Sequence, residues 1–244
     1  MNITNIPKFV VNLERRPDRL ERIKKEMEYV GWDYELFKAI DLNNHGGCTL
    51  SHVGIIKIAK ERGYESVMVI EDDCTFLPYS KDLINKIKNE SGHFEFGVIN
   101  LSPTLNRPVN RSKEQPLFLD ITTYPPKEEY HRGTFATNMI IYHNSIYENI
   151  LEMEKPEILG YYAIDDYIYQ FILPIKQSYC PILPIAPQIS DWSDVSHGNY
   201  NNLYTQTYNW NLYSPCKIPL EYLTGTLTQE LKSNKQHREF IYVN

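Results

Sequence analysis

The sequence predicts an α/β fold class in which a mostly parallel central sheet is flanked by helices. Two observations carry this prediction. The first hundred residues alternate short apolar runs with segments of helical periodicity, as parallel sheets with crossover helices do. The 244 residues, 42% hydrophobic and 23% charged, also have the length and composition to bury a sizeable core. We expect this domain to span residues 1–195, with a C-terminal extension, residues 196–244, packed on it.

Local signals mark the first helix. Pro17 suits a first turn, Asp18 favours the positive end of the helix dipole, and Gly31 is a natural stop. The elements predicted in the first hundred residues are strand 9–13, helix 17–30, strand 34–40, helix 50–59, strand 66–70, helix 80–88 and strand 96–101.

Small residues set the bounds of the second and third helices. Gly46 and Gly47 are predicted to break the chain before helix 50–59, and Gly63 is predicted to close that helix. Ser80 is the expected N-cap of the next helix, because a serine hydroxyl can accept a free backbone N–H.

The alternation ends after residue 101. Residues 102–131, rich in Pro, Arg, Lys and Glu, indicate a functional lid or a disordered loop that contains one strand at 117–121. The later predicted elements are strand 135–142, helix 145–153, a short helix 165–171 and a proline-broken extended segment 182–189.

Composition excludes several classes of protein. A net charge of −6 without a basic cluster argues against a nucleic-acid partner. No apolar run approaches the ~20 residues that span a bilayer, and the first residues lack the pattern of a secretory signal. The four cysteines form no C-x-x-C pair, which argues against a zinc ribbon and fits reduced thiols. We therefore expect a cytoplasmic protein, with peripheral membrane contact and oligomerisation left open.

The sharpest feature is the acidic triplet Glu71-Asp72-Asp73, which follows the apolar strand 66–70. Adjacent carboxylates repel one another, so at the tip of a buried strand they need a cation or strong donors. Oxygen ligands suit Mg²⁺ or Mn²⁺, and the carboxyl ends of parallel strands are where open α/β sheets bind ligands. The triplet therefore predicts a metal site that neutralises a departing diphosphate. A solvated acidic turn is the alternative interpretation.

Five segments, in order, resemble glycosyltransferase family 25, which includes lipooligosaccharide and collagen-type galactosyltransferases. They are VNLERRPDR (11–19), GCTLSH (47–52), IEDD (70–73), GTFAT (133–137) and IDDY (164–167). A late Ser193-Asp194 also resembles the Ser-Asp element of that family. Order and spacing agree from about residue 7 to residue 195, whereas the stretch from residue 196 onward matches nothing in the family.

The resemblance implies a GT-A-like fold and an inverting enzyme that moves galactose or glucose from a UDP-sugar with Mn²⁺ or Mg²⁺. The implied acceptor is a hydroxyl of a lipooligosaccharide, another glycan or glycolipid, or a hydroxylysine-bearing protein. Asp165 and Asp166 match the catalytic base that deprotonates this hydroxyl, and we favour Asp165. The structural alternative is that the pair caps a helix and complements its dipole.

Further residues are expected to bind the donor, together with Glu71 and Asp72. Asn12 and Arg16 follow the first strand, where the resemblance implies contact with the nucleotide, and an arginine can grip a phosphate. For Arg19 we favour a place on a solvated basic helix face. Ser51 and His52 open a helix whose amides could bind an anion, although a lone histidine is more often simply buried.

Residues of the later segments are weaker candidates. The resemblance places Gly133 and Thr134 beside the donor sugar, although the glycine could serve only a tight turn. Asp191, Asp194 and His197 are candidates for a late metal or phosphate ligand, with a polar surface loop as the alternative. The aromatic residues that could stack on an acceptor sugar, or simply pack, are Trp192, Tyr200, Tyr204, Tyr208 and Trp210.

Two other functions compete with a glycosyltransferase. One is a catalytically inactive carbohydrate-binding or scaffold protein on the same fold, against which the acidic triplet and the Asp165-Asp166 pair speak. The other is a nucleotidyltransferase, which would need a glycine-rich basic loop after the first strand, and residues 12–18 contain no glycine. The sugar, the linkage, the acceptor and the role of residues 196–244 are left open.

Overall fold

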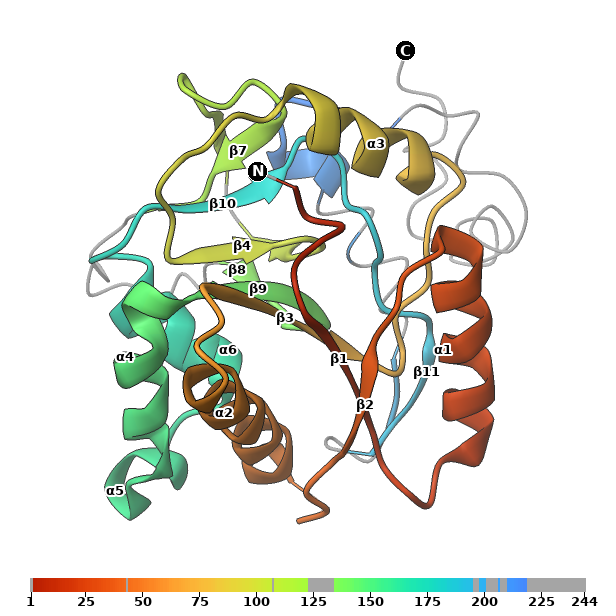
Figure 1. The fold of residues 1–244 in the computed structure, drawn as a ribbon, viewed down its shortest axis with the longest axis vertical. Helices are drawn as coiled ribbons and strands as arrows, with labels where there is room; N and C mark the ends of the chain where they lie inside the picture. The colour runs from red at the N-terminus through yellow and green to blue at the C-terminus, as the bar shows by residue number, and fades with distance from the viewer. Residues whose placement is uncertain are drawn as a thin grey trace.

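The computed structural model describes residues 2–42, 44–106, 108–122, 134–194, 198–200, 206 and 210–218. Its centre is an eight-stranded sheet, and the helices cover the sheet on both sides, which confirms the predicted fold class (Figure 1). From one edge to the other the strands are β2 (Glu35–Lys38), β1 (Lys8–Asn12), β3 (Ser66–Glu71), β9 (Met139–His143), β4 (Val98–Asn100), β10 (Ser178–Pro181), β7 (Phe118–Asp120) and β6 (Asn110–Arg111).

The sheet is mixed rather than mostly parallel. The strands β2, β1 and β3 are parallel neighbours, as the strand–helix alternation predicts. Beyond them β9 runs antiparallel between β3 and β4, because the chain returns through the middle of the sheet after residue 101. On the far side β10 is parallel to β4 but antiparallel to β7, and β7 is antiparallel to β6. The loss of alternation in the sequence marks the point where the parallel pattern stops.

Two groups of helices enclose the sheet. In Figure 1, α1 (Pro17–Val30) and α3 (Ser80–Glu90) lie on one side of it. The other side is covered by α2 (His45–Glu61), α4 (Tyr147–Leu151), α5 (Pro156–Leu159) and α6 (Ile164–Tyr167). Short helical turns extend this second group, namely η1 (Asn144–Ile146), η2 (Glu152–Glu154) and η3 (Ile168–Ile172).

The first two helices begin and end for local reasons. Pro17 stands at the start of α1, and Gly31 ends the helix with a left-handed φ of 68°, as predicted. The predicted break at Gly46 and Gly47 is wrong, because both glycines lie in the first turn of α2. The Asn44 side chain caps this turn by accepting a hydrogen bond from the Gly46 N–H at 2.8 Å. At Gly47 a Cβ would collide with the Ile40 carbonyl oxygen, so the glycine permits a close approach of two backbones.

Two other element predictions need correction. Ser80 is the first residue of α3 rather than its cap, and its hydroxyl donates to the Ile185 carbonyl at 2.5 Å. The predicted strand 135–142 is divided into β8 (Thr134–Phe135) and β9, because Ala136 adopts a left-handed φ of 65° between them. The segment 182–189 contributes only the isolated bridge of Gln188 with Cys74.

The remaining strands form two small sheets. One pairs β5 (Thr104–Leu105) with β8, and the other pairs β11 (Asp191–Ser193) with β12 (Gly198–Tyr200). The described part of the C-terminal extension contacts the domain. Gln206 and Trp210 are buried, and Val109 N–H donates to the Tyr213 carbonyl at 3.2 Å. None of the described helices combines the length and the apolar character needed to cross a membrane.

Candidate functional site

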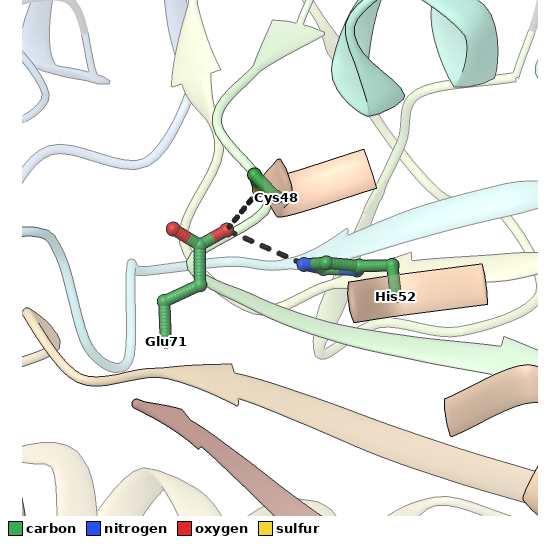
Figure 2. Close-up of side chains that lie close together, drawn as sticks. All are labelled: Cys48, His52 and Glu71. Carbon is green, nitrogen blue, oxygen red and sulfur yellow. Dashed lines mark hydrogen bonds and ion pairs between the residues drawn. The ribbon is translucent and has the colours of Figure 1, made fainter. Parts of the chain in front are cut away.

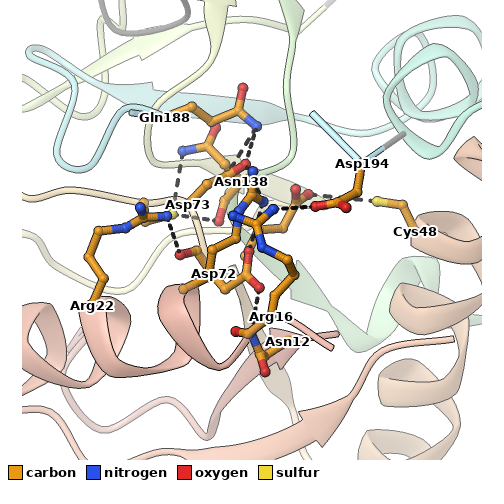
Figure 3. A network of polar contacts seen from close by, with 12 residues as sticks. Asn12, Arg16, Arg22, Cys48, Asp72, Asp73, Asn138, Gln188 and Asp194 are labelled. Atoms are coloured by element: carbon orange, nitrogen blue, oxygen red, sulfur yellow. Dashed lines mark hydrogen bonds and ion pairs between the residues drawn. The ribbon is translucent and has the colours of Figure 1, made fainter. Parts of the chain in front are cut away.

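The site lies where β1 and β3 end side by side. These parallel neighbours pair Val11 with Glu71, so Asn12 stands beside the acidic triplet. Asn12 Nδ2 donates to Asp72 Oδ2 at 2.6 Å (Figure 3). Asn12 and the acidic motif therefore meet at the carboxyl edge of the sheet, while the predicted contact of Asn12 with the donor stays a prediction.

Asp72 is held from both sides. Its Oδ1 accepts from Arg19 Nη1 at 3.1 Å, while Oδ2 accepts from Asn12. Burial raises the pKa of Asp72, and the Arg19 charge opposes this rise. The expectation of a solvated Arg19 is wrong, because the residue is only 7% exposed and its Nη1 also lies 3.5 Å from Asp73 Oδ2. Arg19 thus neutralises part of the charge of the motif from within the domain.

Asp73 carries the least compensated charge of the triplet. Burial, followed by the charges of Glu71 and Asp72, raises its pKa to about 7, and Arg19 and a hydrogen bond from Gln188 only partly oppose this. Gln188 Nε2 lies 3.4–3.5 Å from the two carboxylate oxygens. A cation at Asp73 would relieve the repulsion that raises this pKa.

Glu71 faces away from Asp72, toward α2 and the segment after β8. Its Oε1 accepts from Thr137 Oγ1 at 3.0 Å and lies 3.4 Å from His52 Nε2 and 3.8 Å from Cys48 Sγ (Figure 2). Among the described residues, Cys48, His52 and Glu71 are the group of three potential metal ligands whose ligand atoms lie within 4.8 Å of one another. The three acids of the triplet point in different directions and do not form such a group.

Asp165 is joined to this cluster through the same segment. The Ala136 N–H donates to Asp165 Oδ2 at 3.4 Å, and the next residue, Thr137, holds Glu71. Burial, followed by the charge of Asp166, raises the pKa of Asp165. Asp165 is not the N-cap of α6, a place taken by Ala163, although its Oδ1 accepts from the Asp166 N–H at 3.0 Å. A half-buried carboxylate with a raised pKa suits proton transfer.

A small cavity of about 10 Å³, room for about one water molecule, adjoins this carboxylate. Asp165, Asn100, Ala136 and Thr137 are among its lining residues. Asn100 Nδ2 also donates to the Ala136 carbonyl at 2.7 Å, so both polar groups of the Ala136 backbone are fixed. The segment that carries Asp165's partner is therefore held from two sides.

Arg16 meets a late part of the chain. Its Nη1 donates to Asp194 Oδ2 at 2.5 Å, and Arg15 Nη1 donates to Asp194 Oδ1 at 2.5 Å. Burial favours a higher pKa for Asp194, but the hydrogen bonds from both arginines outweigh it and hold the pKa of this carboxyl below its usual value. Asp194 thus lies beside the end of β1, as an anion bound to the arginine that was predicted to hold a phosphate.

Other predicted residues lie apart from this cluster or outside the described residues. Ser51 is buried and lies within α2 rather than at its start, and its hydroxyl donates to the Gly47 carbonyl and accepts from the Ile40 N–H. Its predicted contact with the donor stays a prediction. Trp210 is fully buried, which is a packing role and not an acceptor surface. Thr134 and Asp191 are described only as backbone, in β8 and β11. The side chains of Trp192 and Tyr200, and all of Gly133, His197, Tyr204 and Tyr208, lie outside the described part.

Four residues that contribute contacts to the site were not predicted from the sequence. Cys48 and Thr137 lie inside motifs that resemble the family, and Cys48 precedes His52 by one helical turn, which is a signal that could have been used. Asn138 and Gln188 offered no such signal. Asn138 Nδ2 donates to the Ala186 carbonyl at 2.6 Å, and the Cys74 thiol donates to the Asn138 carbonyl at 2.9 Å. These contacts are set by the tertiary fold.

Comparison with known proteins gives relatives among the glycosyltransferases. A "Glycosyltransferase 25 family member" of Aedes aegypti is 28% identical over 120 residues, covering 37% of this chain and 19% of that protein. A "Putative glycosyltransferase R655" of Acanthamoeba polyphaga mimivirus is 31% identical over 107 residues, covering 34% of this chain and 33% of that protein. The resemblance to glycosyltransferase family 25 is thus confirmed, although this chain spans only about a fifth to a third of the relatives' length. No family model matches the chain.

A solved structure with a similar arrangement is a glycosyltransferase involved in the glycosylation of the major capsid of PBCV-1. It is 10% identical to this chain, with a TM-score of 0.45, and the match covers 72% of this chain and 80% of that one. At this TM-score the likeness has no bearing on function.

Proposed function

We propose that this protein is a metal-dependent, inverting glycosyltransferase that transfers a hexose, galactose or glucose, from a UDP-sugar to an acceptor hydroxyl. One observation carries the proposal: four motifs far apart in the sequence meet at one edge of the sheet. The meeting consists of Asn12 with Asp72, Thr137 with Glu71, and the Ala136 N–H with Asp165. The glycosyltransferase relatives support the reaction class.

The acidic triplet fits a divalent cation in part. Asp73, whose pKa is raised to about 7 by burial and by its two acidic neighbours, and Glu71 are half-buried oxygen donors of the kind that Mn²⁺ and Mg²⁺ prefer. Asp72 has both oxygens bound by Asn12 and Arg19, so we assign it the task of fixing the motif. When bound, the metal would neutralise charge on the diphosphate leaving group.

The acceptor side is assigned to the carboxylate pair on α6. Asp165 is proposed as the base, because it is linked to Glu71 through adjacent residues and its pKa is raised by burial and by Asp166. Asp166 is the second choice. The raised pKa lies closer to neutral pH, where it makes the carboxylate a more effective proton acceptor.

The donor side is assigned to the end of β1. Arg16 holds an anion, the Asp194 carboxylate, at 2.5 Å, and a phosphate oxygen is an alternative partner of the same chemistry. Asn12 Nδ2 is committed to Asp72 and to the Arg16 carbonyl, at 2.6 and 3.1 Å, so it contributes by placing both groups. The acceptor is proposed, from the family resemblance, to be a glycan, a glycolipid or a hydroxylysine-bearing protein.

The test measures UDP binding by calorimetry in Mn²⁺ and in EDTA, together with a UDP-sugar hydrolysis screen. We expect Mn²⁺ to tighten UDP binding by about 5- to 150-fold, and Asp73→Asn to remove this gain while the protein stays folded. Asp82→Asn, at an exposed carboxylate of α3, is the matched control and should keep the gain. Equal binding of UDP in Mn²⁺ and EDTA would contradict the proposal. Sugar binding without turnover would instead favour an inactive carbohydrate-binding protein.

A further inference from the structure

Cys48, His52 and Glu71 converge beside the acidic motif from two elements. Cys48 and His52 are one turn apart on α2, so their side chains share a face, and Glu71 ends β3 opposite them (Figure 2). Glu71 Oε1 lies 3.8 Å from Cys48 Sγ and 3.4 Å from His52 Nε2. The three ligand atoms all lie within 4.8 Å of one another.

The His52 ring is oriented as a metal-binding histidine would be. Its Nδ1 lies 2.8 Å from the Tyr142 hydroxyl, and the residue is fully buried. Its Nε2 is buried and faces Glu71 Oε1 at 3.4 Å, a contact that is an ion pair when the ring is protonated (Figure 2). A ligating histidine commonly uses one ring nitrogen for the metal and fixes the ring with a hydrogen bond from the other. A cation between Nε2 and Oε1 would bind both atoms at a shorter distance than this long contact provides.

Two separations between the ligand atoms are close to those of a tetrahedral metal site. Zinc–ligand distances of ~2.0–2.3 Å place neighbouring ligand atoms roughly 3.3–3.6 Å apart in a tetrahedron. The measured separations of 3.4 and 3.8 Å from Glu71 Oε1 are close to these edges. The donor set of one thiol, one imidazole and one carboxylate suits Zn²⁺ rather than Mg²⁺, which prefers oxygen ligands alone.

We infer that Cys48, His52 and Glu71 form a binding site for Zn²⁺ or a similar borderline-soft divalent ion. This site differs from the oxygen-ligand site of Asp73 in its Cys48 and His52 ligands and shares the Glu71 carboxylate with it. Three protein ligands leave the fourth position for water or another oxygen ligand. The inference stands on these three side chains and does not depend on the identity of the donor or the acceptor.

The test is a titration of the metal-free protein with Co²⁺, without nucleotide, followed by absorption spectroscopy. Bound Co²⁺ should give intense visible bands of tetrahedral coordination and a near-ultraviolet thiolate-to-cobalt band, saturating at one equivalent and removed by Zn²⁺. Cys48→Ser should abolish the thiolate band. Tyr142→Phe, which removes only the hydroxyl at Nδ1, should weaken Co²⁺ binding by about 10- to 100-fold.

Matched variants separate this site from others. Cys180→Ser alters a buried cysteine of β10 outside the cluster and should keep the full spectrum. Asp73→Asn should also keep the thiolate band, even where it removes Mn²⁺-dependent UDP binding, so the two proposals can fail independently. A thermal melt of each variant shows whether it is folded. The absence of a thiolate band in the wild-type protein, or its persistence in Cys48→Ser, would overturn the inference.

Discussion

Asp165 shows how a single carboxylate is prepared by its neighbours. Its oxygens accept from two backbone N–H groups, those of Ala136 and Asp166, at 3.4 and 3.0 Å. These bonds fix the carboxylate and favour its charged form, while burial and the Asp166 charge favour the protonated form and raise the pKa. The balance leaves a positioned carboxylate that is more basic than a free aspartate.

Asp165→Asn tests this assignment at the residue scale. The amide has the same shape but cannot take a proton, so we expect transfer to fall by about 10²- to 10⁴-fold while Mn²⁺-dependent UDP binding stays within twofold or so of wild type. Single-turnover transfer and UDP calorimetry measure the two effects. Asp166→Asn is the paired variant and should lose less. Transfer near the wild-type rate in Asp165→Asn would mean that the base lies elsewhere.

The candidate site was predictable at some residues and not at others. Asn12 and Asp72 could be placed together, because parallel strands bring their carboxyl ends to one edge. Arg19 could not, because its position on α1 suggested solvent, whereas the tertiary fold turns its guanidinium inward to Asp72 and Asp73. Gln188 came from a segment without periodicity. Local patterns carry information on elements, and contacts across some 50 to 115 residues depend on how those elements pack.

At the scale of elements, a helix or strand was predictable where several local signals agree and was not where tertiary contacts decide its bounds. The helix α1 was predictable because Pro17, its apolar periodicity and Gly31 agree. The division of strand 135–142 could not be predicted. Alanine disfavours a left-handed φ such as the 65° of Ala136, and no local sequence pattern indicates this conformation. Contacts of the Ala136 backbone with Asp165 and Asn100 hold it there. Backbone strain maintained by surrounding contacts is often found at functional sites.

Ala136→Gly measures this strain. Glycine adopts a left-handed φ without the ~1–2 kcal/mol penalty of other residues, although its extra freedom in the unfolded chain offsets ~0.5–1 kcal/mol. We expect the free energy of unfolding in urea to rise by up to about 1 kcal/mol. Gly31→Ala is the mirror control at φ 68°, with open space around a new Cβ, and should lose about 1 kcal/mol. A loss of stability in Ala136→Gly as large as that in Gly31→Ala would show that the Ala136 backbone is not strained.

At the scale of the whole molecule, residues far apart in the chain close the site. Arg15 and Arg16 bind Asp194 across 179 and 178 positions, so a late segment lies against the end of β1. The role of the extension beyond residue 195 could not be predicted from the sequence. Its Gln206 is buried and accepts a hydrogen bond from the Gln188 N–H at 2.7 Å. Since Gln188 contacts Asp73, this extension is linked to the acidic motif through one intermediate residue.

Gln206→Ala tests whether the extension supports the site. The Gln206 amide also donates from Nε2 to the Ser102 carbonyl at 3.2 Å and lies 3.4 Å from Asn138 Oδ1. Its removal leaves buried polar groups without a partner, so we expect the free energy of unfolding to fall by about 1–3 kcal/mol.

Because Gln188 would lose its backbone partner, we also expect Gln206→Ala to weaken Mn²⁺-dependent UDP binding even at a temperature where the variant is fully folded. Leu212→Ala, at a side chain that is 49% exposed in the same extension, is the control and should change neither quantity. Urea unfolding and UDP calorimetry separate the two effects. A variant that is destabilised but binds UDP as the wild type does would show that the extension stabilises the fold without shaping the acidic motif. If Gln206→Ala has the same free energy of unfolding as the wild type, the buried amide does not stabilise the fold. In that case the contacts that connect Gln206 through Gln188 to Asp73 contribute no free energy either.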